Sequence, residues 1–259
     1  MIVNNDSITI NNIPLHNYSF RDAVKKIITK ASGDERENCC VSLTGAHGLV
    51  YARKHPEFEE LLHSFYLNLP DGMPGVWLGR MKGARLMQRC YGPNIFAAIM
   101  KASSTRNIKH FLCGGKEGVA EKLKVACAKK FNNTNITGTY CPPFLGIDEY
   151  DYEMIAEKIN RSGADIVWIG ISTPKQEQFA WRLSHYTNTH FLITVGAAFD
   201  FHTGSVPQAP GLMQQLGLEW FFRLMMEPRR LAKRYMEIVP LFMYYSVLDL
   251  WKYKFNKDS

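Results

Sequence analysis

Hydrophobic positions along the chain form short, nearly continuous runs that alternate with stretches of helical spacing. The runs that predict buried strands are 38–43, 65–69, 109–113, 135–140, 165–171 and 191–195. The stretches with helical spacing are 20–30, 56–63, 93–102, 119–131 and 148–161. Another helix is expected to begin with Pro174 at its first position and to continue to Leu183. Continuous apolar strands alternating with helices predict an α/β fold with a mostly parallel sheet and helices on both faces.

Polar or glycine-rich loops follow several of these strands directly. Thr44, Asp71, Gly114, Gln176 and Asp200 all come just after a predicted strand. Because ligands bind at the carboxyl ends of the strands in open α/β sheets, we expect these loops to line one shared cleft.

Asp71 is the first candidate for a reacting group. It stands in Leu69-Pro70-Asp71-Gly72-Met73-Pro74, at the end of an apolar run. The alternative is an aspartate that only bonds its own turn, which is common in Asp-Gly sequences.

The loop Gly114-Gly115-Lys116-Glu117-Gly118 joins a strand to a helix. Such a loop can present free N–H groups to phosphate, although this one lacks the Walker spacing and only loosely resembles GxGxxG. The alternative is a turn that needs glycine for its backbone conformation.

From Gly211 the pattern changes to a segment rich in aromatic and basic residues. An apolar patch over 241–251 is followed by Lys252, Lys254 and Lys257, and Pro240 is expected to divide this segment. Aromatic side chains beside lysines are typical of helices in a membrane interface. The alternative is a terminal helix packed on its own domain or on a second subunit, which leaves homo-oligomer formation open.

Composition narrows the class of protein. The chain has 259 residues and a net charge of +7, and much of the excess charge lies in the last part of the sequence. Its six cysteines show no metal-ligand or CxxC spacing, so reduced thiols in a cytosolic protein are expected. The sequence predicts neither a signal peptide nor a membrane-spanning segment. The cations cluster beside an apolar patch, so nucleic-acid binding is not favoured.

Six motifs occur in the order found in a known family. They are Thr44-Gly45-Ala46-His47-Gly48, Leu69 to Pro74, Gly114-Gly115-Lys116, Thr173-Pro174-Lys175-Gln176-Glu177, Gly196 to Phe201, and Gly217-Leu218-Glu219-Trp220 through Glu227-Pro228-Arg229-Arg230. From about Asn38 to Tyr235 the chain resembles the WecG/TagA/CpsF glycosyltransferases, glycosyltransferase family 26.

The resemblance implies an inverting, metal-independent enzyme that needs no cofactor. Such an enzyme moves a sugar from a UDP-sugar to a polyprenyl-diphosphate-linked saccharide during surface polysaccharide synthesis. It would be peripheral on the cytoplasmic face of the cell membrane. The implied organisation is a Rossmann-like core over residues 1–210 and a helical appendage over 211–259 that completes the active site and contacts the membrane.

The resemblance also implies residue roles. Asp71 would be the general base, Thr44 would line the same pocket, and Gln176 would contact the reacting sugars or diphosphate. The cations Arg223, Arg230 and Lys233 would close over the site and neutralise diphosphate. The other expected substrate or diphosphate contacts are His47, Gly114, Gly115, Lys116, Lys175 and Asp200. Many relatives have asparagine two residues after the threonine, where this chain has Ala46 followed by His47.

The residues themselves agree with this chemistry. Transfer from a UDP-sugar needs a base near the attacking hydroxyl and positive charge or N–H groups at the departing diphosphate. One carboxylate suffices for a single inverting displacement, whereas glycoside hydrolysis usually needs two. A nucleotide-sugar-modifying enzyme is the alternative in the same chemistry, but a clear GxGxxG after the first strand is missing. A membrane-surface binding protein is the alternative from another class.

Overall fold

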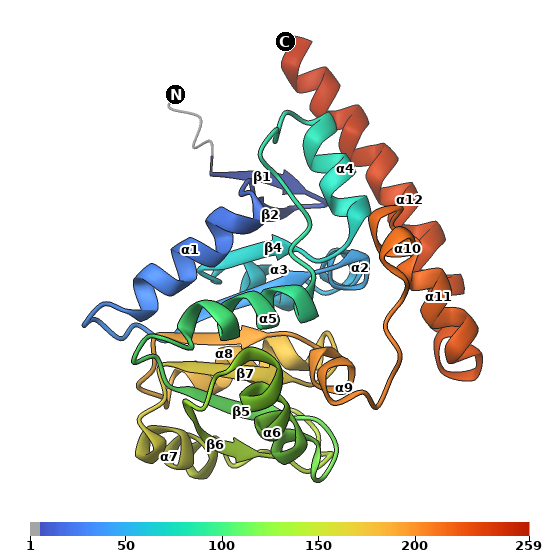
Figure 1. The fold of residues 1–259 in the computed structure, drawn as a ribbon. Coiled ribbons are helices and arrows are strands. Elements are labelled where there is room, and N and C mark those ends of the chain that lie inside the picture. Colours follow the sequence, from blue (N-terminus) through green and yellow to red (C-terminus); the bar gives the residue numbers. More distant parts are fainter. Residues whose placement is uncertain (1–5, 259) are drawn as a thin grey trace.

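The structure, a computed structural model, describes residues 6–258, with the side chains of 215, 230 and 256–258 outside the described part. Its centre is a six-stranded parallel sheet, which confirms the predicted mostly parallel sheet (Figure 1). The strand order is β4-β3-β8-β7-β5-β6. The strands are β3 (Cys39–Thr44), β4 (Leu67–Pro70), β5 (His110–Gly114), β6 (Ile136–Tyr140), β7 (Ile166–Gly170) and β8 (Phe191–Thr194). A separate antiparallel hairpin is formed by β1 (Ser7–Ile10) and β2 (Ile13–His16).

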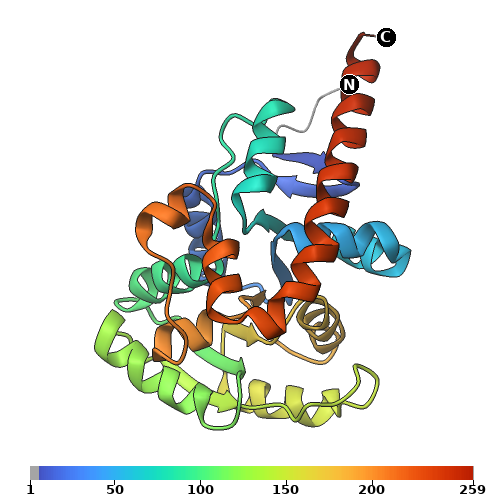
Figure 2. The same ribbon diagram turned by 90° about the vertical axis from the view of Figure 1, so that its right-hand side faces the viewer.

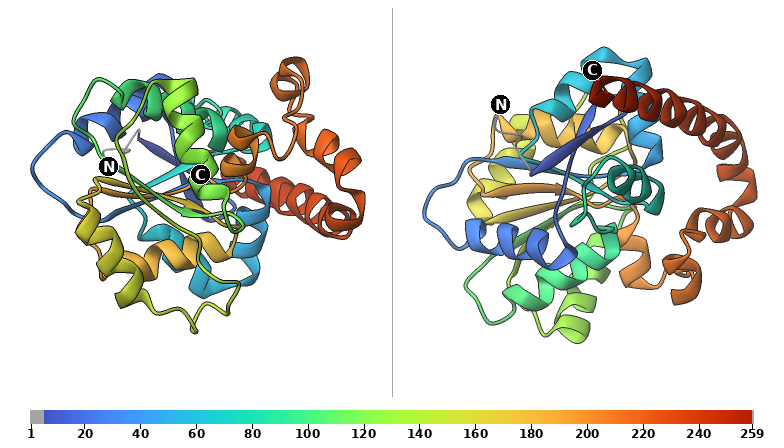
Figure 3. Two further views of the ribbon diagram at one scale, coloured as in Figure 1. Left: turned by 60° about the horizontal axis from the view of Figure 1, so that its bottom comes forward. Right: turned by 90° about the horizontal axis from the view of Figure 1, so that it is seen from above.

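Helices cover both faces of this sheet, as its apolar strands require (Figure 3). Successive residues of a strand point to opposite faces, so Val167 packs into one core and Trp168 into the other. The Trp168 side receives α1 (Phe20–Ala31), α5 (Gly92–Ser103), α6 (Val119–Phe131) and α9 (Ala198–Thr203). The Val167 side receives α2 (Ala46–Lys54), α3 (Pro56–His63), α7 (Tyr152–Ser162) and α8 (Lys175–Ser184).

Helix α4 (Met73–Met81) was not predicted from the sequence. Its first turn contains Pro74 and Gly75, which look like a continuing turn, but Pro fits the first turn of a helix. Gly79 is needed for packing, because a Cβ atom there would lie 2.4 Å from the Met87 sulfur. Two other helices begin later than the sequence predicts. Helix α7 begins after Asp151, whose carboxylate accepts from Met154 N–H, and α8 begins only after Pro174.

The chain ends in α10 (Gly211–Gln215), α11 (Glu219–Met226) and the long α12 (Pro228–Asp258) (Figure 2). Helix α12 continues through Pro240, so the predicted division there is wrong. Proline removes the hydrogen bond to the carbonyl four residues earlier, which belongs to Met236. Met236 is 72% exposed, so this side of the helix faces water.

Helix α12 lies against the core along one face. Ile238 and Phe242 belong to the apolar cluster that also holds α2 and α3. The buried Lys82 ammonium donates to an Asp249 carboxylate oxygen at 2.9 Å, and Lys54 pairs with Glu237 at 2.7 Å. One face of α12 therefore packs on its own domain, which is one of the two alternatives considered for this segment.

The other face of α12 remains apolar and exposed. Its large side chains are Met236, Met243, Tyr244, Val247, Trp251 and Phe255. Among residues 6–258, no helix is both long enough and apolar enough to cross a membrane. All six cysteines are free thiols, as expected.

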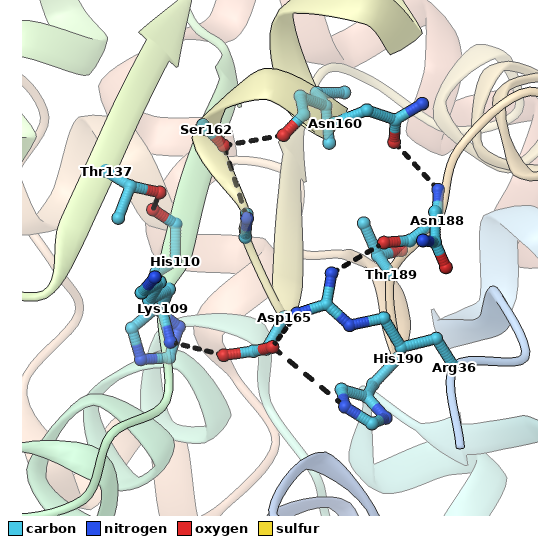
Figure 4. Close-up of polar contacts among 12 residues, drawn as sticks. Arg36, Lys109, His110, Thr137, Asn160, Ser162, Asp165, Asn188, Thr189 and His190 are labelled. Carbon is cyan, nitrogen blue, oxygen red and sulfur yellow. Dashed lines mark hydrogen bonds and ion pairs between the residues drawn. The ribbon is translucent and has the colours of Figure 1, made fainter. Parts of the chain in front are cut away.

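At the amino ends of the strands, Asp165 is the centre of a polar cluster (Figure 4). Its carboxylate accepts from Arg36 Nη2 at 2.7 Å and from the Lys109 backbone N–H at 2.8 Å. Its backbone carbonyl accepts from the His190 N–H at 2.9 Å. Asp165 thus joins the starts of β5, β7 and β8 at the end of the sheet opposite Asp71.

Candidate active site

Asp71 lies directly after β4, at the carboxyl end of the sheet. Its backbone N–H donates to the Thr44 carbonyl at 3.1 Å, which ties the loop after β4 to the end of β3. The carboxylate oxygen Oδ1 accepts from the Gly92 N–H at 2.9 Å. The other oxygen, Oδ2, lies 3.7 Å from where a Cβ atom on Gly45 would be. Because Gly45 has no side chain, nothing from that residue covers Oδ2.

The surroundings of Asp71 raise its pKa to about 6. Removal from water is the main cause, since it disfavours the charged form, and the neighbouring Glu219 carboxylate acts in the same direction. Arg89, the Gly92 N–H and Arg223 oppose the shift. The side chain keeps partial contact with solvent. Asp71 is therefore charged at neutral pH and is able to take up a proton.

Arg89 joins Asp71 to the C-terminal helices. Its Nε donates to the Asp71 carbonyl at 2.7 Å, and Nη2 pairs with Glu219 of α11 at 2.5 Å. Its Nη1 donates to the Gln214 carbonyl at 3.2 Å. The guanidinium also lies over the Tyr91 ring, 4.2 Å from its centroid. One half-buried cation thus fixes the position of α11 relative to Asp71.

Thr44 and Gln176 meet through one buried carboxyl group, that of Glu177. Thr44 Oγ1 donates to Ser42 Oγ at 2.9 Å, and Ser42 Oγ is 3.5 Å from Glu177 Oε1. Gln176 Nε2 donates to the same oxygen at 2.9 Å. Gln176 Oε1 in turn accepts from the Gly196 N–H at 3.0 Å. The loops after β3, β7 and β8 are therefore connected beneath the site.

Glu177 has an unusual environment for a carboxyl group. It is 1% exposed, and burial raises its pKa to about 7 although hydrogen bonds from Gln176 and Thr173 oppose the shift. Its Oε1 is crowded with donors, whereas its buried Oε2 has no hydrogen-bond partner among the described residues. An acid near half-protonation thus lies at the centre of the network.

The cations expected to close over the site occupy different positions. Arg223, on α11, influences the pKa of Asp71, and its guanidinium lies 5.7 Å from the Phe201 ring centroid. Its buried Nε has no hydrogen-bond partner among the described residues. Lys233 is exposed on α12, and the side chain of Arg230 lies outside the described residues.

His47 faces α12. Burial and the nearby Arg234 lower its pKa to about 4, while Glu237 opposes the shift, so His47 is neutral at pH 7. Its neighbours are therefore charged side chains of the C-terminal helix.

The glycine loop after β5 is shaped by close backbone contact. Gly114 has φ of 139°, and a Cβ atom there would lie 2.6 Å from the Gly170 carbonyl oxygen. Gly115 has φ of 75° and donates its N–H to the same oxygen at 2.9 Å. Gly114 therefore allows close packing between β5 and β7. Gly115 is favoured by its positive φ and by the closeness of Val119, 2.9 Å from where its Cβ atom would be.

The remaining candidates surround this end of the sheet. Lys116 is exposed, and Asp200 is half-buried in the first turn of α9. The Lys175 ammonium donates to the Leu145 carbonyl and lies 5.0 Å from the Tyr150 ring centroid. In this conformation Lys175 contacts the loop before α7, away from Glu177. The roles of these three residues in binding stay predictions.

Sequence reasoning missed Arg89, Glu219 and Glu177 as site residues. Glu219 and Glu177 both belong to motifs of the family resemblance. A charged residue in an otherwise apolar or buried segment could have indicated a role for each of them. Arg89 has no local signal, because its partner Glu219 is 130 residues away in the sequence.

The site offers one accessible base, nearby guanidinium groups and several helix amino termini. Among residues 6–258, no three His, Cys, Asp or Glu side chains gather as a metal site would require. This arrangement suits removal of a proton from a hydroxyl beside a negatively charged leaving group.

Fold and site together define an α/β protein with its candidate active site at the carboxyl ends of a parallel sheet. A family model described as "Glycosyl transferase WecG/TagA/CpsF family" matches residues 8–256. The chain belongs to this family of glycosyl transferases, which confirms the resemblance found in the sequence. The chain is also similar to N-acetylglucosaminyldiphosphoundecaprenol N-acetyl-beta-D-mannosaminyltransferase of Bacillus subtilis (strain 168). The two are 28% identical over 222 residues, which cover 86% of this chain and 84% of the relative.

Proposed function

We propose that this chain transfers a sugar from a UDP-sugar to a polyprenyl-diphosphate-linked saccharide in the synthesis of a surface polysaccharide. The observation that carries the proposal is Asp71, a half-buried carboxylate with a pKa of about 6 and one oxygen beside a glycine. The named activity of the Bacillus relative, transfer of an N-acetylmannosaminyl group to a diphosphoundecaprenol-linked sugar, supports the same acceptor class here.

In the proposed reaction Asp71 is the general base. The acceptor hydroxyl attacks the anomeric carbon of the donor sugar while Asp71 Oδ2 takes up the hydroxyl proton. The bond from the anomeric carbon to the diphosphate oxygen breaks, and UDP leaves with the electron pair. A single displacement inverts the anomeric configuration and needs no covalent intermediate, so one carboxylate is sufficient.

Positive charge from the protein stabilises the departing diphosphate in this proposal. Arg223 is the best-supported group for two reasons. Its buried Nε has no hydrogen-bond partner among the described residues, and its positive charge is near enough to Asp71 to lower the pKa of that carboxyl group. Guanidinium groups bind phosphate oxygens through paired hydrogen bonds. Such groups would make the reaction independent of a divalent metal. Thr44 and Gln176, which the hydrogen bonds around Glu177 hold in place, would orient the sugars.

The C-terminal segment, residues 211–259, completes the site and brings it to the cytoplasmic membrane face. The contact between Arg89 and Glu219 supports the first role. The exposed apolar face of α12 supports the second, because aromatic and aliphatic side chains enter the interfacial region of a bilayer.

The test is a panel of UDP-sugars with a short-chain polyprenyl-diphosphate N-acetylglucosamine, followed by mass spectrometry. UDP-N-acetylmannosamine, its uronic acid and UDP-glucose are the first donors to compare. We expect one donor to add a single sugar to the acceptor, with UDP released in equal amount, an inverted linkage by NMR and no loss with EDTA. Absence of product from every donor would contradict the proposed function, and loss with EDTA would contradict metal independence.

A further inference from the structure

A largely apolar groove lies between α11 and α12, outside the Asp71 site. Its volume is about 480 Å³. It is lined by Trp220 and Leu224 from α11 and by Ala232, Tyr235, Met236 and Val239 from α12. The Trp220 and Tyr235 rings meet edge to face at 5.9 Å. Trp220 is 40% exposed and Met236 is 72% exposed, so the groove opens to solvent.

Helix α11 connects this groove to the reaction centre. Residues four positions apart share a helix face, and one position corresponds to a rotation of roughly 100°. Glu219 and Arg223 therefore form one face of α11, toward Arg89 and Asp71. Trp220 and Leu224 form the neighbouring face, which lines the groove. The same two turns of helix thus carry a charged face at the site and an apolar face beside it.

Helix α12 connects the groove to the exposed apolar surface. Met236 lines the groove and is followed seven residues later by Met243, and then at intervals of four by Val247 and Trp251. All four side chains are exposed. At this spacing they lie along one side of the helix. The groove is therefore the inner end of an apolar stripe whose outer part has no cover within the described chain.

We propose that this groove holds the first isoprene units of the acceptor, next to its diphosphate. The inference rests on the proposed function and identifies the part of the protein that binds the lipid chain. A polyprenyl diphosphate has a strongly anionic group joined directly to a branched hydrocarbon. Arg223 and the adjoining groove match that order of charge and apolar surface, within two turns of α11.

The apolar stripe explains how such a chain reaches the groove. The carrier lies in the bilayer, and the stripe on α12 leads from its exposed end to Met236. Removing the hydrocarbon of two isoprene units from water stabilises the complex and therefore lowers KM. The groove thus distinguishes a prenyl-linked acceptor from the same saccharide without its lipid.

The experiment fills the groove with Ala232→Phe and compares acceptors with two and eleven isoprene units in detergent. Val125→Phe is the matched control, because Val125 is exposed on α6, remote from the groove. We expect Ala232→Phe to raise KM for both prenyl acceptors at least tenfold. The melting temperature of Ala232→Phe and its binding to anionic lipid vesicles should stay unchanged. Val125→Phe should match the wild type in every assay.

A second measurement tests the groove without catalysis. Calorimetric titration with farnesyl diphosphate should show binding to the wild type and at least tenfold weaker binding to Ala232→Phe. Equal binding by both proteins would overturn the groove assignment even if transfer activity were established. Loss of vesicle binding in Ala232→Phe, with unchanged acceptor KM, would make the groove a membrane contact instead. If the wild type is a dimer and Ala232→Phe is a monomer, the groove is a subunit interface instead.

Discussion

Carboxyl groups at the two ends of the central sheet have contrasting surroundings. At the amino end, both oxygens of Asp165 accept hydrogen bonds, one from the Arg36 guanidinium and one from a backbone N–H (Figure 4). At the carboxyl end, burial outweighs the partners of Asp71 and Glu177 and raises both pKa values, to about 6 and about 7. Glu177 Oε2 has no partner among the described residues.

This difference distinguishes a carboxylate suited to stabilising the fold from carboxyl groups suited to proton exchange. A carboxylate whose two oxygens both accept hydrogen bonds, as in Asp165, joins neighbouring strands and stabilises the fold. A carboxyl group whose charged form is disfavoured weakens the fold at neutral pH, but it can exchange protons near that pH. Perturbed carboxyl groups are expected at functional sites, and in this chain both lie at the end of the sheet that also carries Arg89 and Arg223.

The largest expected effect is the loss of transfer on Asp71→Asn. Asparagine keeps an acceptor for the Gly92 N–H and nearly the same shape, but it cannot take up a proton. We expect kcat to fall by roughly 10²- to 10⁴-fold, the usual contribution of a general base. The melting temperature should not fall. Steady-state kinetics with mass-spectrometric detection of the product provide the measurement.

The pH profile sharpens this prediction. In the wild type, kcat/KM should decrease about tenfold for each pH unit below about 6, because protonated Asp71 cannot act as a base. Full activity of Asp71→Asn, or a flat profile between pH 4 and pH 7, would remove Asp71 from the role of base.

Glu177→Gln should change how stability depends on pH. The folded protein raises the pKa of Glu177 from 4.5 to about 7, so the protonated form is favoured by folding. Its contribution to stability is complete below pH 4.5 and is lost as the pH rises through 7. At about 1.4 kcal/mol per pKa unit, the wild type loses on the order of 3 kcal/mol that the glutamine variant does not lose.

Urea unfolding of both proteins at pH 5 and pH 8 measures this difference. Subtracting the two pH effects removes the contributions of all other titrating groups. A pH dependence that is the same in the wild type and in Glu177→Gln would mean that Glu177 is charged at neutral pH in the folded protein, contrary to its surroundings.

The sequence was sufficient to predict the fold where the local pattern of apolar residues determines the structure. The runs that became β3, β7 and β8 are apolar at nearly every position because helices cover both faces of the sheet, and that requirement is visible in the residues themselves. The same pattern placed Thr44, Asp71 and Gln176 at one end of the sheet. The order of the motifs identified the family, which the family model confirmed.

The sequence was insufficient where distant residues decide structure. Whether Pro240 breaks α12 depends on the exposure of Met236, which is fixed by how the helix lies on the core. The pairing of Arg89 with Glu219 depends on the fold bringing α11 to the loop before α5. The raised pKa of Glu177 depends on burial by three loops, and a motif of polar residues gives no sign of it.

The smallest effect belongs to the amino end, where Asp165→Asn should reduce stability without affecting chemistry. Asparagine has one acceptor oxygen, so its amide group would face either Arg36 or the Lys109 N–H, donor against donor. Loss of a hydrogen bond to a charged group predicts about 2 kcal/mol less free energy of unfolding. Asp148→Asn is the matched control, because Asp148 pairs with Arg182 but its side chain is 78% exposed, and such pairs contribute less than about 1 kcal/mol. Urea unfolding at pH 7 and kcat per folded molecule should separate the two ends of the sheet. A tenfold fall in kcat for folded Asp165→Asn would show that the amino end also takes part in the reaction.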